Sequence, residues 1–281
     1  MNTKAPLIGV FDSGIGGLSV LRALQEALPH ARYTYLADNA WAPYGERDAD
    51  ALHARVRSLI THWHSAAKLD LLVVACNTAT AIAVEGLRSD LPHLPVVGIE
   101  PALKPAFATS RSRSIGVLAT RATLQSARYL RLRDDCLSSA STISLQECCA
   151  DGLAGAIESD DHAATRSLLE AYIGALLRAL PDMDTLVLGC THYPLVRNMV
   201  QDVAGMHVAL MDPAEAVARR AVHLLGNAVK AGTPSGAPQW QCTGSPAMLT
   251  AAARRWLRRD VAVSPGSFDP PTASLVRPVV P

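Results

Sequence analysis

One short sequence pattern occurs twice in this chain and constrains the fold more than any other feature. Each copy is an apolar run followed by a small residue, a cysteine and polar residues, at residues 71–78 (Leu-Leu-Val-Val-Ala-Cys-Asn-Thr) and 185–192 (Thr-Leu-Val-Leu-Gly-Cys-Thr-His). The pattern is typical of a buried strand that leads into a helix. The positive field of a helix N-terminus favours thiolate over thiol. Two cysteines in matched positions, Cys76 and Cys190, therefore predict a pair of facing acid–base groups.

Strand-like and helix-like patterns alternate along the chain. Short apolar runs at residues 7–11 and 33–36 are each followed by apolar residues at helical spacing, over residues 18–28 and 52–63. This alternation is typical of an α/β fold with mostly parallel strands. Ligands of such sheets bind at the carboxyl ends of the strands, where both cysteines are expected to lie.

The chain also repeats itself on a larger scale. Ile-Gly-Val-Leu-Ala-Thr at residues 115–120 resembles Ile-Gly-Val-Phe-Asp-Ser at residues 8–13. Together with the two cysteine patterns, this predicts two pseudo-equivalent doubly wound α/β domains, with mostly parallel sheets and the active site in the cleft between them. The expected parts are a discontinuous first domain with Cys76 (residues 1–98 and 209–267), a second domain with Cys190 (99–208) and a proline-rich tail (268–281).

A glycine-rich turn, Asp-Ser-Gly-Ile-Gly-Gly at residues 12–17, follows the first apolar run. One interpretation is a dinucleotide-binding loop, with Asp38 as the acidic residue about 20 positions on. The spacing does not fit, because Ser19 stands where the third glycine or alanine belongs, and Asp12 would face the pyrophosphate. A turn that offers backbone N–H groups to a carboxylate fits better, with Asp12 binding an ammonium group or assisting a thiol.

Composition excludes several kinds of function. The net charge of +1 predicts neither a nucleic-acid nor a membrane partner. Six cysteines without a C-x-x-C pair indicate reduced thiols rather than a disulfide framework or a zinc site. The apolar stretch at residues 5–11 is too short for a signal peptide, and no run reaches the roughly 18 apolar residues of a membrane span. We therefore expect a cytoplasmic protein without a bound metal.

These motifs together resemble the bacterial glutamate racemases of the cofactor-independent aspartate/glutamate racemase superfamily. In related aspartate racemases the second cysteine motif typically reads Gly-Cys-Thr-Glu, whereas position 192 is His here, which favours glutamate. The matching stretches extend to about residue 265 and comprise residues 11–17, 42–45, 75–78, 98–102, 116–120 and 189–194.

The resemblance implies a set of site residues. Cys76 and Cys190 would be the two bases, with Asp12 assisting the first and His192 the second. Glu158 stands where the family has a further acidic residue. The implied substrate contacts are Asp12, Ser13, Tyr44, Gly45, Asn77, Thr78, Thr191 and His192, with Thr120 and Thr123 as further candidates.

The resemblance implies racemisation of L-glutamate to D-glutamate without a cofactor, with D-glutamate supplied to peptidoglycan synthesis. We also expect a homodimer. An α-proton is weakly acidic, and the chain carries no evident motif for an electron sink such as pyridoxal phosphate, so the site itself must supply a base and stabilise charge. A thiol pKa of about 8.5 needs only a modest shift to give a base near neutral pH. Two alternatives stay open: racemisation of aspartate or a hydantoin, and a non-catalytic carboxylate-binding or regulatory protein.

Overall fold

The structure is a computed structural model that describes residues 5–139, 142–226 and 236–266. Its core contains two parallel β-sheets. Every strand pair is parallel, as the alternating pattern predicts. The first sheet contains, in spatial order, β10 (Val263–Pro265), β9 (Gln239–Cys242), β2 (Arg32–Ala37), β1 (Leu7–Asp12), β3 (Leu71–Val74) and β4 (Val96–Gly98). The second contains β6 (Ser144–Cys149), β5 (Ser114–Ala119), β7 (Thr185–Gly189) and β8 (Ala209–Met211).

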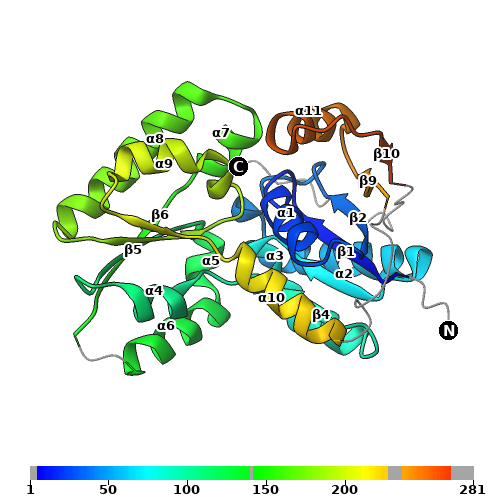
Figure 1. The fold of residues 1–281 in the computed structure, drawn as a ribbon, viewed down its shortest axis with the longest axis horizontal. Helices are drawn as coiled ribbons and strands as arrows, with labels where there is room; N and C mark the ends of the chain where they lie inside the picture. Colours follow the sequence, from blue (N-terminus) through cyan, green and yellow to red (C-terminus); the bar gives the residue numbers. More distant parts are fainter. Residues whose placement is uncertain (1–4, 140–141, 227–235, 267–281) are drawn as a thin grey trace, which may run out of the picture.

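Helices cover both faces of each sheet, so the doubly wound α/β prediction is confirmed (Figure 1). On the first sheet, one face carries α1 (Leu18–Ala27), α10 (Ala214–Leu225) and α11 (Pro246–Leu257), and the other carries α2 (Ala49–Ala67) and α3 (Asn77–Asp90). On the second, one face carries α7 (Leu153–Glu158), α8 (His162–Ala179) and α9 (Arg197–Ala204), and the other carries α4 (Leu103–Thr109) and α6 (Ala127–Ser139). Short helices complete the set: η1 (Tyr44–Glu46), α5 (Arg121–Gln125) and η2 (Tyr193–Val196).

Helix α2 shows why these segments fold as they do. Its buried residues are Leu52, Val56, Leu59, Ile60 and Trp63, the apolar positions whose spacing predicts one helix face. Asp48 caps the start of the helix by accepting a hydrogen bond from the Ala51 N–H. Lys68, in a left-handed conformation, ends it.

The two sheets repeat one strand order. β1 lies between β2 and β3 with β4 outside, and β5 lies between β6 and β7 with β8 outside. Cys76 follows β3 and Cys190 follows β7, which are equivalent strands of the repeat. The predicted pseudo-equivalence is therefore present in the topology.

Three details differ from the expectations or lie outside them. The second cysteine pattern leads into the 3-10 helix η2 before α9, not directly into an α-helix, and Pro194 lies in the first turn of η2.

Strand β8 pairs with β7, so residues 209–211 belong to the second sheet, although the expected first domain resumes at residue 209. We therefore propose that the chain returns to the first unit after Met211. The tail at residues 268–281 lies outside the described residues.

The described residues contain no helix long and apolar enough to cross a membrane. All six cysteines lie within these residues as free thiols.

The end of β7 generates a stability prediction. A Cβ added at Gly189 would lie 2.6 Å from Ala119 Cβ and 3.1 Å from the Leu118 carbonyl oxygen, and neither atom belongs to a flexible side chain. We expect Gly189→Ala to destabilise the protein by about 1–3 kcal/mol in urea unfolding, because strands β5 and β7 must separate.

Gly174→Ala is the matched control. Gly174 lies within α8, and only the long Arg178 side chain approaches its added Cβ, at 3.3 Å. We expect this change to stabilise the protein by about 0.5–1 kcal/mol through helix propensity. Equal effects of the two substitutions would contradict the close-packing argument.

Candidate active site

A cavity of about 180 Å³ lies between the two units, at the carboxyl ends of the strands. Both Cys76 and Cys190 line it, one from each unit. Every residue that the sequence predicts for the site lines this cavity except Asp12 and Thr123. The cleft therefore brings together side chains from the turn after β1, η1, α3, α7 and the turn after β7.

Cys76 is the N-cap residue of α3. Its sulfur accepts a hydrogen bond from the Ala79 N–H at 3.5 Å and lies 3.6 Å from Ser13 Oγ. Burial nevertheless raises the pKa of the Cys76 thiol to about 12, and the nearby negative charge of Asp12 adds to this rise. The expected preference for thiolate is therefore wrong for Cys76, because burial outweighs the helix field.

Asp12, at the end of β1, faces the second unit rather than Cys76. The carboxylate is completely buried, accepts the Gly14 N–H at 2.7 Å and accepts the Thr191 hydroxyl at 3.3 Å. Burial raises the pKa of Asp12, while the charge of His192 opposes the rise. Among the described residues, Asp12 and Cys76 share no hydrogen bond, so Asp12 affects this thiol through its charge.

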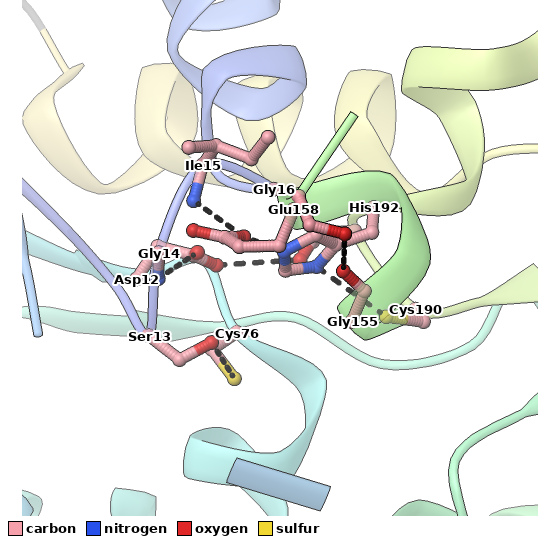
Figure 2. Close-up of polar contacts among 12 residues, drawn as sticks. Asp12, Ser13, Gly14, Ile15, Gly16, Cys76, Gly155, Glu158, Cys190 and His192 are labelled. Carbon is pink, nitrogen blue, oxygen red and sulfur yellow. Dashed lines mark hydrogen bonds and ion pairs between the residues drawn. The ribbon is translucent and has the colours of Figure 1, made fainter. Parts of the chain in front are cut away.

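Cys190 belongs to a chain of three polar groups, shown in Figure 2. Its sulfur lies 3.7 Å from His192 Nδ1, and His192 Nε2 lies 2.5 Å from Glu158 Oε2. Burial alone would lower the pKa of His192, but the hydrogen bonds to Cys190 and Glu158 and the charge of Glu158 raise it well above 6.5. His192 can therefore hold a proton next to the Cys190 sulfur at neutral pH.

Glu158 connects this chain to the first unit. Its Oε2 also accepts the Ile15 N–H at 3.3 Å, and its buried Oε1 has no hydrogen-bond partner among the described residues. A Cβ added at Gly14 would lie 2.4 Å from this carboxylate, and one at Gly16 would lie 2.5 Å from Thr191 Oγ1. Glycine at these two positions therefore allows the close contact between the two units beside the cavity.

The remaining predicted residues supply polar groups. The Thr78 hydroxyl lies 3.3 Å from that of Thr120, which donates to Thr123 at 2.9 Å. Thr123 does not line the cavity itself, but it accepts this hydrogen bond from Thr120, which does. The Asn77 amide is buried, and neither its nitrogen nor its oxygen has a partner among the described residues. A buried amide without partners, next to a cavity, suits a polar ligand.

The sequence analysis missed part of the cavity wall. Ala154, Gly155 and Ser159 reach it from α7 and its C-terminal end, and Met248 reaches it from α11. Sequence offers no chemical signal for these small and apolar residues, because only the tertiary fold brings them to the site. The part of the chain that the structure describes contains no group of three or more His, Cys, Asp or Glu residues that could hold a metal ion.

Comparison with known proteins agrees with this geometry. Residues 8–221 match the family model of Asp/Glu/hydantoin racemases. A glutamate racemase of Ectopseudomonas mendocina is 45% identical over 231 residues, which cover 80% of this chain and 84% of the relative.

Solved structures of glutamate racemases are also similar to this chain. A glutamate racemase of Bacillus anthracis superposes with a TM-score of 0.82 at 30% identity, covering 93% of this chain and 97% of that one. The Escherichia coli glutamate racemase, solved in complex with L-glutamate and the activator UDP-MurNAc-Ala, superposes with a TM-score of 0.76 at 31% identity. The match covers 90% of this chain and 95% of that one.

The Cys190–His192–Glu158 chain generates a prediction. A glutamine side chain can accept a hydrogen bond but carries no negative charge, so Glu158→Gln should lower the pKa of His192. Below its pKa the imidazole is charged, so the variant should lose that charge at lower pH than the wild type. Histidine ¹⁵N NMR titration, assigned with His192→Gln, measures this shift.

His162 provides the internal control. Its Nε2 lies 3.1 Å from Asp160 Oδ1, which Glu158→Gln leaves in place, so its ¹⁵N signals at a given pH should be the same in the variant and the wild type. An unchanged His192 midpoint in the variant would show that Glu158 does not hold the proton on His192.

Proposed function

This chain belongs to the Asp/Glu/hydantoin racemase family, and from that premise we propose that Cys76 and Cys190 interconvert L- and D-glutamate as two opposed bases. The reaction is glutamate racemisation, as in the relatives that are glutamate racemases at 40–46% identity. The observation that carries the two-base proposal is the presence of one thiol from each unit in a single cavity. In a two-base racemisation, one group removes the α-proton from one face and the other delivers a proton to the opposite face, so the two groups must reach one ligand from different sides.

Cys190 takes the α-proton from L-glutamate in this proposal. The thiolate that it needs is favoured by a charged His192, whose Nδ1 lies 3.7 Å from the sulfur. Glu158 keeps the proton on His192 through the 2.5 Å contact at Nε2. Glu158 and His192 are thus positioning and charge-holding groups for the base on the second unit.

Cys76 acts on the opposite face and takes the α-proton from D-glutamate. Burial raises the pKa of Cys76 to about 12, which favours the thiol that can deliver a proton to the carbanion. The α-ammonium group of a bound amino acid brings a positive charge into the cavity, which lowers the pKa of a nearby thiol. The Ala79 N–H and Ser13 Oγ, at 3.5 and 3.6 Å, then stabilise the thiolate.

The cavity walls supply the groups that a dicarboxylate needs. Ser13, Asn77, Thr78 and Thr191 offer hydroxyl or amide donors, and the Tyr44–Gly45 backbone offers N–H groups. The Thr120 hydroxyl, which lies 3.3 Å from that of Thr78, adds a further polar group to the cavity wall. Binding among these buried groups strengthens each of the contacts and stabilises negative charge on the α-carboxylate during proton transfer.

The wider setting is part of the same proposal. By family resemblance, D-glutamate from this reaction is used in peptidoglycan synthesis, and the enzyme acts in the cytoplasm as a homodimer. Light scattering of the purified protein tests the dimer, and growth of a depleted strain with added D-glutamate tests the cell-wall role.

Solvent exchange tests the activity and the mechanism together. Purified protein in D₂O with D-glutamate should lose the circular dichroism signal, and the L-glutamate formed should carry deuterium at the α-carbon by mass spectrometry. Aspartate and a hydantoin, tested in parallel, should react far more slowly. Inversion without solvent hydrogen would contradict the two-base mechanism, and no change with glutamate would contradict the activity.

Single cysteine variants separate the two faces. Cys76→Ala and Cys190→Ala should both abolish racemisation while staying folded, with at most about 1–2 kcal/mol lost in stability. A glutamate analogue that eliminates a leaving group from its β-carbon needs only one base. Cys76→Ala should then process only the L-analogue, through Cys190, and Cys190→Ala only the D-analogue, through Cys76. Loss of the same enantiomer in both variants would overturn the assignment.

A further inference from the structure

Asp38, at the carboxyl end of β2, is the centre of a buried polar cluster beside the cavity, and of its members only Tyr44 lines the cavity. The Asp38 side chain is completely buried. Oδ2 accepts the Tyr44 hydroxyl and Arg55 Nε, both at 2.6 Å. Oδ1 accepts Arg55 Nη2 at 2.6 Å and the Thr243 hydroxyl at 2.5 Å. We name these four residues, Asp38, Tyr44, Arg55 and Thr243, the Asp38 cluster.

The cluster fixes both ends of one loop. Residues 39–45 run from β2 to η1, and Asn39, Ala42, Pro43, Tyr44 and Gly45 of this loop line the cavity. The Trp41 N–H donates to the Asp38 carbonyl at 2.9 Å, and the Arg55 guanidinium lies 4.5 Å from the centre of the Trp41 ring. A bidentate arginine stacked on an aromatic ring has little freedom, so the loop is held at its middle as well.

The same loop is tied to the C-terminal part of the first unit. The Ala40 N–H donates to the Thr243 hydroxyl at 3.3 Å, and the Gly244 N–H donates to Asn39 Oδ1 at 2.7 Å. The Asn39 amide donates to the Ser245 carbonyl at 2.9 Å. Ser245 is the N-cap position of α11, which carries Met248 into the cavity wall. Thr243 therefore joins two segments that border the site.

We propose that Asp38 is a positioning residue which, through Arg55 and Thr243, holds the Tyr44–Gly45 backbone where it binds the carboxylate of the substrate. This inference rests on the proposed function, since it takes glutamate as the ligand. Asp38 does not line the cavity, and Arg55 balances its charge, so it is not suited to move a proton. Loosening the cluster should weaken glutamate binding more than it slows proton transfer, because both thiols keep their hydrogen-bond partners.

The chain contains a matched control on the same helix. Arg57 of α2 also forms a bidentate pair, with Asp90, and its Nε lies 2.6 Å from Asp90 Oδ2. That pair is partly exposed, at 37% and 29% of the two side chains, and neither residue lines the cavity. Arg55→Lys and Arg57→Lys therefore make the same chemical change, at the Asp38 cluster and away from it.

Steady-state racemisation in both directions provides the test. Arg55→Lys should raise KM for both enantiomers of glutamate about tenfold with kcat changed less than about threefold, because lysine keeps the charge but loses the planar fork. Arg57→Lys should change neither value more than about twofold. Thr243→Val should raise KM about threefold, and Thr243→Ser, which restores the hydroxyl, should return it to the wild-type value.

The outcomes separate this inference from the proposed function. A wild-type protein that does not racemise glutamate overturns the proposed function. An active wild type, with Arg55→Lys folded by circular dichroism and kinetically equal to Arg57→Lys, overturns only the role of Asp38. If Arg55→Lys does not fold, the Thr243 pair decides: equal KM values for Thr243→Val and wild type overturn the inference. A loss of kcat without a change in KM overturns it as well.

Discussion

The contact between the second unit and the glycine-rich turn of the first is the one on which the rest of the site depends. Thr191 and His192 pack against Gly16 so closely that an added Cβ would overlap both side chains. Glu158 occupies the equivalent space at Gly14. Because a side chain at either position would hold the units apart, these glycines set the width of the cavity and place both thiols within reach of one small ligand.

Burial at this contact then governs the acid–base chemistry. Asp12, Glu158 and His192 are charged or polar groups removed from water, so each depends on the others for stabilisation. The two thiols lie in different surroundings as a result. Cys76 lies near the negative charge of Asp12, whereas Cys190 lies next to a histidine with a raised pKa. The pseudo-symmetry of the fold therefore does not extend to the electrostatic surroundings of the two thiols.

Local sequence patterns predict the elements of this protein well, and the cysteine patterns predict the two thiols that line the cavity. The face of α2 and the strands before Cys76 and Cys190 follow from apolar spacing alone. Three features do not follow from it. Burial reverses the expected effect of the helix field on Cys76, since local sequence does not report how deeply a residue lies. Asp38 acquires its role from Thr243, which is distant in sequence. Met248 lines the cavity only because α11 packs on the first sheet, a tertiary contact without a sequence motif.

The chain passes between the two units twice, after β4 and after β8, and the two connections lie side by side. Residues 98–102 and 211–213 border the same groove, away from the thiols. Two neighbouring covalent links constrain the relative placement of two units more than a single link does, because each link limits the movement that the other permits. Because both links border a groove that shares no lining residue with the cavity, neither link crosses the space that Cys76 and Cys190 line.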